Sequence, residues 1–312
     1  MNPIKIIKNR SDIGAGTRGS DMGIDAIEIA AINTENDFFN IHPYIDIQTH
    51  NETIYNKNKN TFAKRINFVC EQCERLREGV KKELQKGFFP LILSGDHSSA
   101  LGSLSGIQKA NPDKEIGVIW LDAHADIHTP YSTPSGNIHG MPLAAALSID
   151  NKEFSKNKVS DSTEKNWLRM KNMGDKVPLI KPENLIYFGV RDTEKEEDQI
   201  IQSKKIKNFS VNDVRNIGLK SCIDQTIDQF VSTDLIYISF DIDALDCDLF
   251  SRGTGTPVSK GFLTEEIISI IKEVKDTGKL VALEICEINP LLDNKGNQMA
   301  ESAFEIISSV LS

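Results

Sequence analysis

Several classes of protein are excluded by what the sequence lacks. No apolar run reaches the roughly 18 residues that a membrane-spanning helix needs, and the first residues lack the apolar core of a signal peptide. The chain has only five cysteines, an odd number spread widely over 312 residues, which argues against a disulfide framework. We therefore expect a cytoplasmic protein that does not bind membranes.

Basic residues are also scarce relative to acidic ones. The chain has 36 lysines and arginines against 45 aspartates and glutamates, a formal charge of −9, and its lysines are scattered among acids. Nucleic-acid binding needs a basic patch or stripe, so we expect no nucleic-acid partner. With 39% apolar and 26% charged residues, the composition is that of a globular protein. No change of composition marks a second domain, so we predict one domain over residues 1–312, with a surface insertion around 150–181, the most polar stretch.

Two kinds of segment alternate along the chain. Short apolar runs bounded by turn residues are typical of buried strands, and they are Phe88–Leu93, Ile116–Leu121, Asn184–Phe188, Leu235–Phe240 and Leu280–Ile285. Between them lie segments with helical spacing, among them one from Phe62 to Leu84 that stops at Gly87 and one from Thr264 to Gly278. This alternation predicts an α/β fold with a mostly parallel sheet and helices on both faces. In such sheets, ligands bind beyond the carboxyl ends of the strands.

Candidate metal ligands follow three of the predicted strands. They are His97, Asp122, His124, Asp126, Asp241 and Asp243. Alternate residues of an extended chain point to one side, so the spacing from Asp122 to Asp126 brings three ligands together without a special turn. Four converging carboxylates are tolerated only when cations neutralise them. Six ligands, mostly oxygen, exceed the needs of one tetrahedral zinc ion and suit two Mn²⁺ ions bridged by shared carboxylates, although Co²⁺ and Ni²⁺ would accept such a site too.

Two divalent ions indicate a hydrolytic reaction. A hydroxide that bridges them forms near neutral pH, because metal binding lowers the pKa of water from about 16 to about 7, and it can attack an electron-poor trigonal carbon. Glu287, which follows a fourth strand, could hold a cationic substrate through a bidentate pair. His139 could deliver a proton to a leaving amine.

Six motifs stand in a fixed order across nearly the whole chain. They are Ser-Gly-Asp-His-Ser (94–98), Asp-Ala-His-Ala-Asp (122–126), Ser-Gly-Asn-Ile-His-Gly-Met-Pro (135–142), Ser-Phe-Asp-Ile-Asp-Ala-Leu-Asp (239–246), Gly-Thr-Pro (255–257) and Glu-Ile-Asn-Pro (287–290). Together they resemble the ureohydrolase family, and within it the bacterial arginases. The resemblance implies a three-layer α/β/α sandwich of the arginase and deacetylase type, two Mn²⁺ ions per subunit, and hydrolysis of L-arginine to L-ornithine and urea. It also implies a homo-oligomer, a trimer or a hexamer.

The same resemblance implies a role for each matching residue at the metals. It gives one ion to His97, Asp122, Asp126 and Asp241, and the other to Asp122, His124, Asp241 and Asp243. Glu287 matches the family's guanidinium-facing glutamate, and His139 matches its proton-shuttle histidine. The resemblance also implies a catalytic role for Asp126.

A second group of positions matches contacts to the substrate. They are His128, Ser135, Asn137, Glu194, Glu197 and, near the metals, Thr256. Ser135 and Asn137 match the pair that reads the α-carboxylate. His128 stands where many arginases have an asparagine that grips the amino-acid end. Glu194 keeps the charge that binds an α-ammonium group, and Glu197 matches a further acidic contact.

Three rival functions stay open. Agmatinase and formimidoylglutamase are related ureohydrolases, but agmatine lacks the α-carboxylate that Ser135 and Asn137 would read. A two-metal phosphoesterase has similar sequence fragments, but in another order, since here the Gly-Asp-His motif at His97 comes first. A non-catalytic homologue retained for binding is the third, although all six candidate ligands are intact.

Two further motifs have plainer interpretations. Gly14–Gly19 fits the dinucleotide-binding pattern, but it begins several residues after the first apolar run, so a loop that shapes the rim of the pocket is favoured over a nucleotide site. Cys70 and Cys73 have redox-motif spacing, yet they lie inside a predicted helix, and Cys73 is expected in the core.

Overall fold

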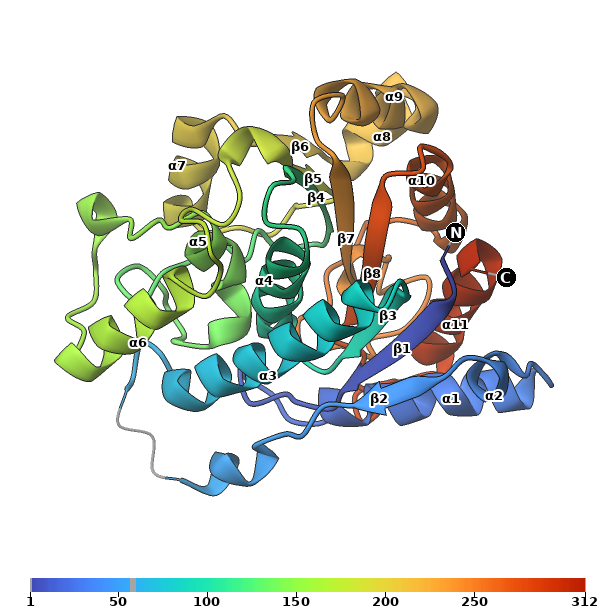
Figure 1. The fold of residues 1–312 in the computed structure, drawn as a ribbon, viewed down its shortest axis with the longest axis horizontal. Coiled ribbons are helices and arrows are strands. Elements are labelled where there is room, and N and C mark those ends of the chain that lie inside the picture. Colours follow the sequence, from blue (N-terminus) through green and yellow to red (C-terminus); the bar gives the residue numbers. More distant parts are fainter. Residues whose placement is uncertain (1, 57–59, 312) are drawn as a thin grey trace.

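One eight-stranded sheet runs through the protein. The computed structural model describes residues 2–56 and 60–311. The strands are β1 (Ile4–Asn9), β2 (Tyr44–Asp46), β3 (Phe89–Ser94), β4 (Ile116–Leu121), β5 (Leu185–Phe188), β6 (Lys207–Phe209), β7 (Leu235–Asp241) and β8 (Leu280–Cys286). They lie in the order β2-β1-β3-β8-β7-β4-β5-β6, and each neighbouring pair is parallel (Figure 1).

Helices cover both faces of this sheet. One layer consists of α1 (Gly23–Asn33), α8 (Val211–Ile217), α9 (Leu219–Gln229), α10 (Thr264–Asp276) and α11 (Gln298–Leu311). The other consists of α3 (Ile66–Gln85), α4 (Ala100–Ala110), α5 (Pro142–Ala146), α6 (Asp161–Lys171) and α7 (Lys195–Lys204). Alternate strand residues supply the two cores, so that Ile6 and Leu91 pack toward the first layer while Ile7 and Ile92 pack toward the second. The predicted three-layer α/β/α sandwich is confirmed.

The five predicted strands are present, with ends that shift by no more than about two residues. Three strands were not predicted. Lys5, Lys8 and Asn9 interrupt the apolar pattern of β1, and the edge strands β2 and β6 have only three residues each, too few to show a period. The central strands are buried on both faces, so their sequences are continuously apolar, and this is why they could be predicted.

Helix α3 begins later than its sequence pattern predicts. The expected start at Phe62 moves to Ile66, because Arg65 adopts a left-handed conformation with φ of 56° and donates from its Nε to the carbonyl of Ile13 at 2.7 Å. The predicted stop is confirmed, since Gly87 has φ of 83°. Cys73 is buried on the apolar stripe of this helix, as expected.

The polar stretch 150–181 contains a helix that contributes to the core. Trp167 of α6 is buried beside α3 and α5, and its indole N–H donates to Oδ1 of Asp150 at 2.9 Å. Arg169 makes two hydrogen bonds with Glu74 of α3, at 2.7 and 2.6 Å. The segment therefore lies on the outer side of the α3 layer with its own buried anchor.

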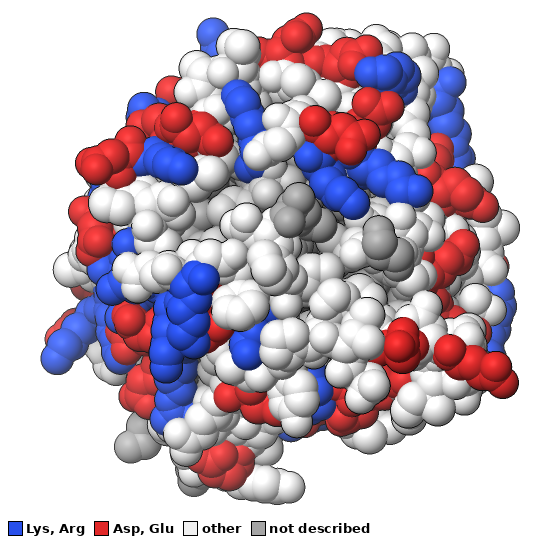
Figure 2. Space-filling view, turned by 45° about the vertical axis from the view of Figure 1, so that its right-hand side comes forward, with Lys and Arg blue, Asp and Glu red and all other residues white. Residues whose placement is uncertain are grey.

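The surface carries both signs of charge. Figure 2 shows acidic and basic side chains interspersed over one face of the molecule. Among the described residues, no helix combines the length and apolar character that a membrane crossing requires.

Candidate metal centre

The candidate ligands and Glu287 lie at the carboxyl ends of four strands that are consecutive in the sheet. The order β3-β8-β7-β4 brings the ends of these strands side by side. His97 follows β3, Asp122 follows β4, Asp241 ends β7 and Glu287 follows β8. Parallel strands direct their carboxyl ends to one edge, so residues almost 200 positions apart in the chain meet there.

His97 stands at the middle of the cluster and is fully buried. Its Nδ1 lies 3.1 Å from Oδ2 of Asp122, 3.0 Å from Oδ2 of Asp126 and 3.3 Å from Oδ2 of Asp241. Despite these short distances, this nitrogen has no hydrogen-bond partner with suitable geometry among the described residues. A buried nitrogen without a partner, facing three carboxylate oxygens, fits a metal ligand.

Two neighbours fix the orientation of the His97 ring. Its Nε2 lies 2.8 Å from Oγ of Ser239, and its ring stacks on Trp120 with 4.0 Å between ring centroids. A partner on one ring nitrogen sets the direction of the other, so Ser239 and Trp120 hold Nδ1 toward the carboxylates. Trp120 stands two positions before Asp122, which directly follows β4, and Ser239 stands two positions before Asp241, which ends β7, so the alternation of side chains predicts their side of the sheet.

A second group forms around His124. Its Nδ1 lies 3.0 Å from Oδ2 of Asp243 and 3.5 Å from Oδ1 of Asp122. Asp243 also accepts hydrogen bonds from the backbone N–H of Ala123 at 3.1 Å and from Oγ1 of Thr256 at 3.1 Å. Ala123 thus holds Oδ1 of Asp243 and Thr256 holds Oδ2, so Thr256 lies beside the cluster.

The burial of so many carboxylates shifts their protonation. Burial, together with Asp243 and Asp122, raises the pKa of Asp241 well above its usual range. Burial and the neighbouring Asp122 raise the pKa of Asp126 to about 6. Burial would also raise the pKa of Asp122, but the neighbouring rings of His124 and His97 lower it. Positive charge, from protons or from metal ions, is therefore what allows these groups to be packed together.

The ligand atoms fall into two overlapping sets that fit two ions. Those of His97, Asp122 and Asp126 lie within 4.8 Å of one another, and so do those of Asp122, His124 and Asp243. Asp122 belongs to both sets. A shared carboxylate between two sets of mixed nitrogen and oxygen donors is the arrangement expected for a pair of bridged divalent ions.

Glu287 and His139 form a pair beside this cluster. Nδ1 of His139 lies 2.9 Å from Oε1 of Glu287, and the same oxygen accepts from the backbone N–H of His97 at 2.9 Å. Burial would lower the pKa of His139, but the Glu287 carboxylate raises it to about 9, and burial would raise the pKa of Glu287, but His139 lowers it. The pair is therefore ionised at neutral pH, with a proton held on His139.

Two cluster residues have strained backbones. Glu287 has φ of 64° and Asp126 has φ of 48°, in the left-handed region that side chains other than glycine rarely adopt. Each such residue costs on the order of 1–3 kcal/mol and persists where the surroundings enforce it, typically at functional sites.

A third group gathers the predicted contacts to the amino-acid end of a substrate. Nε2 of His128 lies 2.8 Å from Oε2 of Glu194 and 3.5 Å from Oε2 of Glu197. The hydrogen bond with His128 lowers the pKa of Glu194 to about 2, whereas burial raises the pKa of Glu197 to about 8. Burial would lower the pKa of His128, but the bond to Glu194 raises it. Nε2 of His128 thus already lies against both of these side chains.

Ser135 and Asn137 lie near a cation that the sequence did not reveal. Oγ of Ser135 accepts from the backbone N–H of Asn137 at 3.2 Å, and Oδ1 of Asn137 accepts from Nζ of Lys64 at 3.0 Å. Lys64 comes from the loop before α3 and belongs to no motif, so only the fold brings it to Asn137.

The glycine-rich loop Gly14–Gly19 lines this end of the site. The backbone N–H of Gly14 donates to Oδ2 of Asp96 at 2.8 Å, and a Cβ on Gly16 would lie 2.5 Å from Nδ2 of Asn137. Glycine is needed there because the loop approaches the site so closely. The predicted rim loop agrees with this position.

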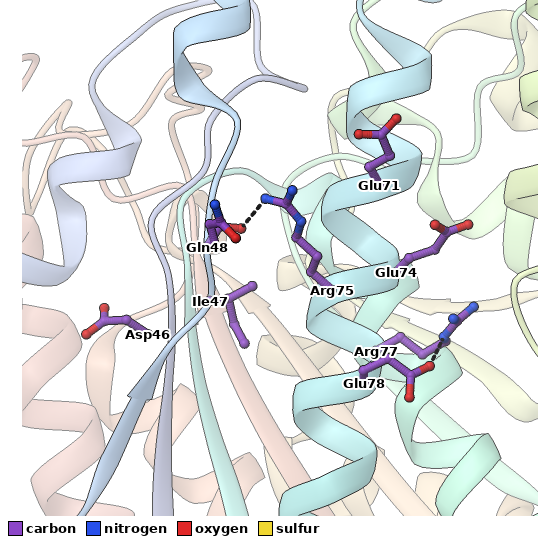
Figure 3. A pocket seen from close by; sticks show the side chains of 8 residues that line it. All are labelled: Asp46, Ile47, Gln48, Glu71, Glu74, Arg75, Arg77 and Glu78. Atoms are coloured by element: carbon purple, nitrogen blue, oxygen red, sulfur yellow. Dashed lines mark hydrogen bonds and ion pairs between the residues drawn. The ribbon is translucent and has the colours of Figure 1, made fainter.

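A separate groove of about 520 Å³ lies between the end of β2 and the outer face of α3 (Figure 3). Its charged side chains are engaged locally: Arg75 donates to the carbonyls of Gln48 and Thr49, and Arg77 donates to Glu78. This groove shares no residue with the metal-ligand cluster.

Comparison with known proteins finds that the chain is similar to arginases. A model of the Arginase family matches residues 3–312. The chain is 34% identical over 310 residues to the arginase of Bacillus subtilis, and the match covers 99% of this chain and 97% of that protein. The native structure of the arginase from Bacillus caldovelox superposes with a TM-score of 0.85 at 32% identity, covering 100% of this chain and 99% of that one. The arginase of Entamoeba histolytica, solved in complex with L-ornithine, superposes with a TM-score of 0.83 at 30% identity, covering 99% of this chain and 97% of that one.

Proposed function

The chain belongs to the arginase family, and we propose that it hydrolyses L-arginine to L-ornithine and urea at the metal centre described above. The observation that carries this proposal is the pair of ligand sets that share Asp122, directly beside the ionised pair of Glu287 and His139. The L-ornithine in the Entamoeba relative supports the choice of substrate.

We propose that the centre holds two Mn²⁺ ions, with Asp122 and Asp241 shared between them. The remaining ligands are His97 and Asp126 on one side, and His124 and Asp243 on the other. Divalent ions in such a site lower the pKa of water from about 16 to about 7 and so supply a nucleophile at neutral pH. The preference for Mn²⁺ over Co²⁺ or Ni²⁺ comes from the family resemblance, because all three accept this donor set.

In this proposal, Glu287 binds the reacting guanidinium group and His139 protonates the amine that leaves it. The buried carboxylate of Glu287 binds the guanidinium through charge-assisted hydrogen bonds and orients its carbon toward the nucleophile. His139 holds a proton on a ring that contacts Glu287, so it can deliver that proton to the departing amine of ornithine. Asp126, whose carboxylate lies 3.0 Å from Nδ1 of His97, would accept a proton from the attacking water in this proposal.

The amino-acid end of arginine fits the opposite rim. We propose that Ser135 and Asn137 read the α-carboxylate, with Lys64 adding positive charge. Glu194 and Glu197 face the α-ammonium group. Nε2 of His128 already contacts both side chains, so the α-ammonium group competes with this ring for them.

Steady-state kinetics on a panel of guanidino compounds test the substrate. We expect urea release from L-arginine to exceed that from agmatine by at least about 100-fold in kcat/KM, because agmatine leaves the carboxylate-reading groups unpaired. Comparable turnover of agmatine would indicate an agmatinase, and selective hydrolysis of formimidoylglutamate would indicate the other related ureohydrolase.

The remaining alternatives have their own tests. Turnover of a generic phosphodiester would revive the phosphoesterase. A non-catalytic homologue would bind fewer than about one metal ion per chain after loading with Mn²⁺, because its ligand set would have lost its function.

We also propose a cytoplasmic location, supported by the five cysteines, all of which are unpaired thiols. The expectation of a homotrimer or homohexamer stays a prediction from the family resemblance.

A further inference from the structure

Cys286 lies beside the candidate metal ligands His97 and Asp241. It is the last residue of β8, which lies between β3 and β7 in the sheet, and it pairs in register with Asp241. Glu284, two residues earlier, accepts hydrogen bonds from Ser94 of β3 and Tyr237 of β7, at 2.6 and 2.5 Å. Because alternate residues of a strand share a face, Cys286 points to the same side as Glu284, toward the cluster.

The thiol lies close enough to two candidate ligands for all three to bind the same ion. Its Sγ, a ring nitrogen of His97 and a carboxylate oxygen of Asp241 all lie within 4.8 Å of one another. All three residues are buried, and Nδ1 of His97 has no hydrogen-bond partner with suitable geometry in the described part of the chain. A buried ring nitrogen, a thiol and a carboxylate at these distances provide three donors for one ion.

Outside the cluster, the described residues offer the thiol little else. Its one hydrogen bond with them is a weak contact of 3.7 Å from Sγ to the carbonyl of Phe240. An apolar residue would fill the same space, and the proposed reaction uses no thiol. Sulfur differs from the other ligands because it is a soft donor, which favours Co²⁺ and Zn²⁺ over Mn²⁺.

We propose that Cys286 is a ligand of the ion held by His97 and Asp241, and that it biases this centre toward softer divalent ions such as Co²⁺ and Zn²⁺. The Sγ–H bond breaks as the metal–sulfur bond forms, and its proton passes to solvent, since a coordinating thiol is deprotonated by the metal. The proposal rests on the proposed function only for the presence of the metal centre.

Absorption spectroscopy of the cobalt-loaded full-length chain tests the proposal directly. After removal of bound metal by a chelator, the protein is titrated with Co²⁺ and its near-ultraviolet spectrum is recorded. We expect a sulfur-to-cobalt charge-transfer band in the wild type, and its loss in both Cys286→Ser and Cys286→Val. Cys222→Ser is the matched control, because Cys222 is also fully buried but packs in the core on α9, and its band should equal that of the wild type. We further expect Cys286→Ser to weaken Co²⁺ binding by about tenfold or more and Mn²⁺ binding by no more than about threefold.

The outcomes separate this proposal from the function on which it rests. A wild-type protein that binds two Co²⁺ ions without the band overturns the role of Cys286 and leaves the proposed hydrolysis intact. A band that survives in Cys286→Val overturns it as well. If the wild type takes up neither Co²⁺ nor Mn²⁺, the metal centre and both proposals are wrong. The wild-type spectrum and the valine variant decide the question even where the serine variant does not fold.

Discussion

Glu287 combines a strained backbone, a fully buried carboxylate and an ionised partner in His139. A fold maintains such a residue only against its cost in stability, so the strain indicates that the carboxylate is needed at that place. In the proposed reaction, its negative charge is what holds the guanidinium group.

Replacing Glu287 by glutamine removes that charge while keeping the size of the side chain. We expect arginine affinity to fall by roughly 10- to 100-fold, since hydrogen bonds to charged groups contribute about 1.5–3 kcal/mol. Metal content should change little, because Glu287 lies outside both three-residue ligand sets. Calorimetric titration with an arginine analogue that keeps the guanidinium group but is not hydrolysed, together with metal analysis, measures the two effects. Unchanged affinity for that analogue would rule out the proposed role of Glu287.

His128 leads to a prediction on pH. Its pKa is raised in the folded protein by the bond to Glu194, so its contribution to stability is fully present below about pH 6.5 and is lost as pH rises through the folded pKa. We expect His128→Asn to lower the free energy of unfolding more at pH 6 than at pH 9, by about 1 kcal/mol or less, because Glu194 is about half exposed. Urea unfolding at both pH values, with metal content held equal, measures the difference.

His42 is the matched control for this experiment. Burial lowers its pKa, so its stabilising contribution is lost as pH falls rather than as it rises. His42→Asn should therefore show the opposite trend or none. An equal trend in the two variants would mean that the pairing of His128 with Glu194 is not the cause.

At the scale of elements, α3 and α4 pack closely because of glycine. A Cβ on Gly102 of α4 would lie 2.5 Å from the carbonyl oxygen of Cys73, and one on Gly106 would lie 2.7 Å from that of Arg77. This close approach fixes the start of α4, and with it His97, relative to the sheet.

Gly102→Ala should destabilise the protein by about 1–3 kcal/mol, because a backbone atom cannot yield to the added methyl group. Gly79→Ala in α3 is the control, because its Cβ would meet the flexible ends of side chains rather than backbone, with Cδ1 of Ile47 at 2.7 Å and Cδ1 of Ile45 at 3.6 Å. That variant should gain up to about 1 kcal/mol from helix propensity. Urea unfolding of both variants gives the comparison, and stabilisation by Gly102→Ala would refute the close packing.

Two neighbouring residues of helix α6 allow a second comparison of stability. Trp167→Ala should cost about 3–5 kcal/mol, since it empties a buried site and leaves Asp150 without its indole partner. Leu168→Ala, on the exposed side of the same helix, should change the free energy of unfolding by no more than about 0.5 kcal/mol. Equal effects would mean that α6 is not anchored by Trp167. The assignment of the whole chain to one domain stays a prediction.

Over the whole molecule, metal binding and folding are coupled. The ligands come from the ends of β3, β4 and β7, so the two sets form only when the sheet is complete, and ions bound there stabilise the native state.

Removal of metal by a chelator should lower the Tm by about 4 °C or more, since binding of one ion at 100 times its Kd contributes about 2.7 kcal/mol. Thermal unfolding of chelated and Mn²⁺-loaded protein at one scan rate measures this. Restoration of the Tm by excess Mn²⁺ is the control for effects of the chelator itself. An unchanged Tm in protein shown to be free of metal would contradict the coupling.

The sequence by itself determined the central strands, the sandwich architecture and the six candidate ligands. These features are local: apolar runs report burial on both faces, and a spacing of two along a strand places ligands on one side. The resemblance to the family depends on the same short motifs.

Only the tertiary structure decided which side chains from distant segments meet. The placement of Lys64 beside Asn137, of His128 between Glu194 and Glu197, and of Cys286 beside His97 depends on strand order and loop paths. No period or spacing in one stretch of chain encodes these contacts, because each depends on the packing of elements far apart in the sequence.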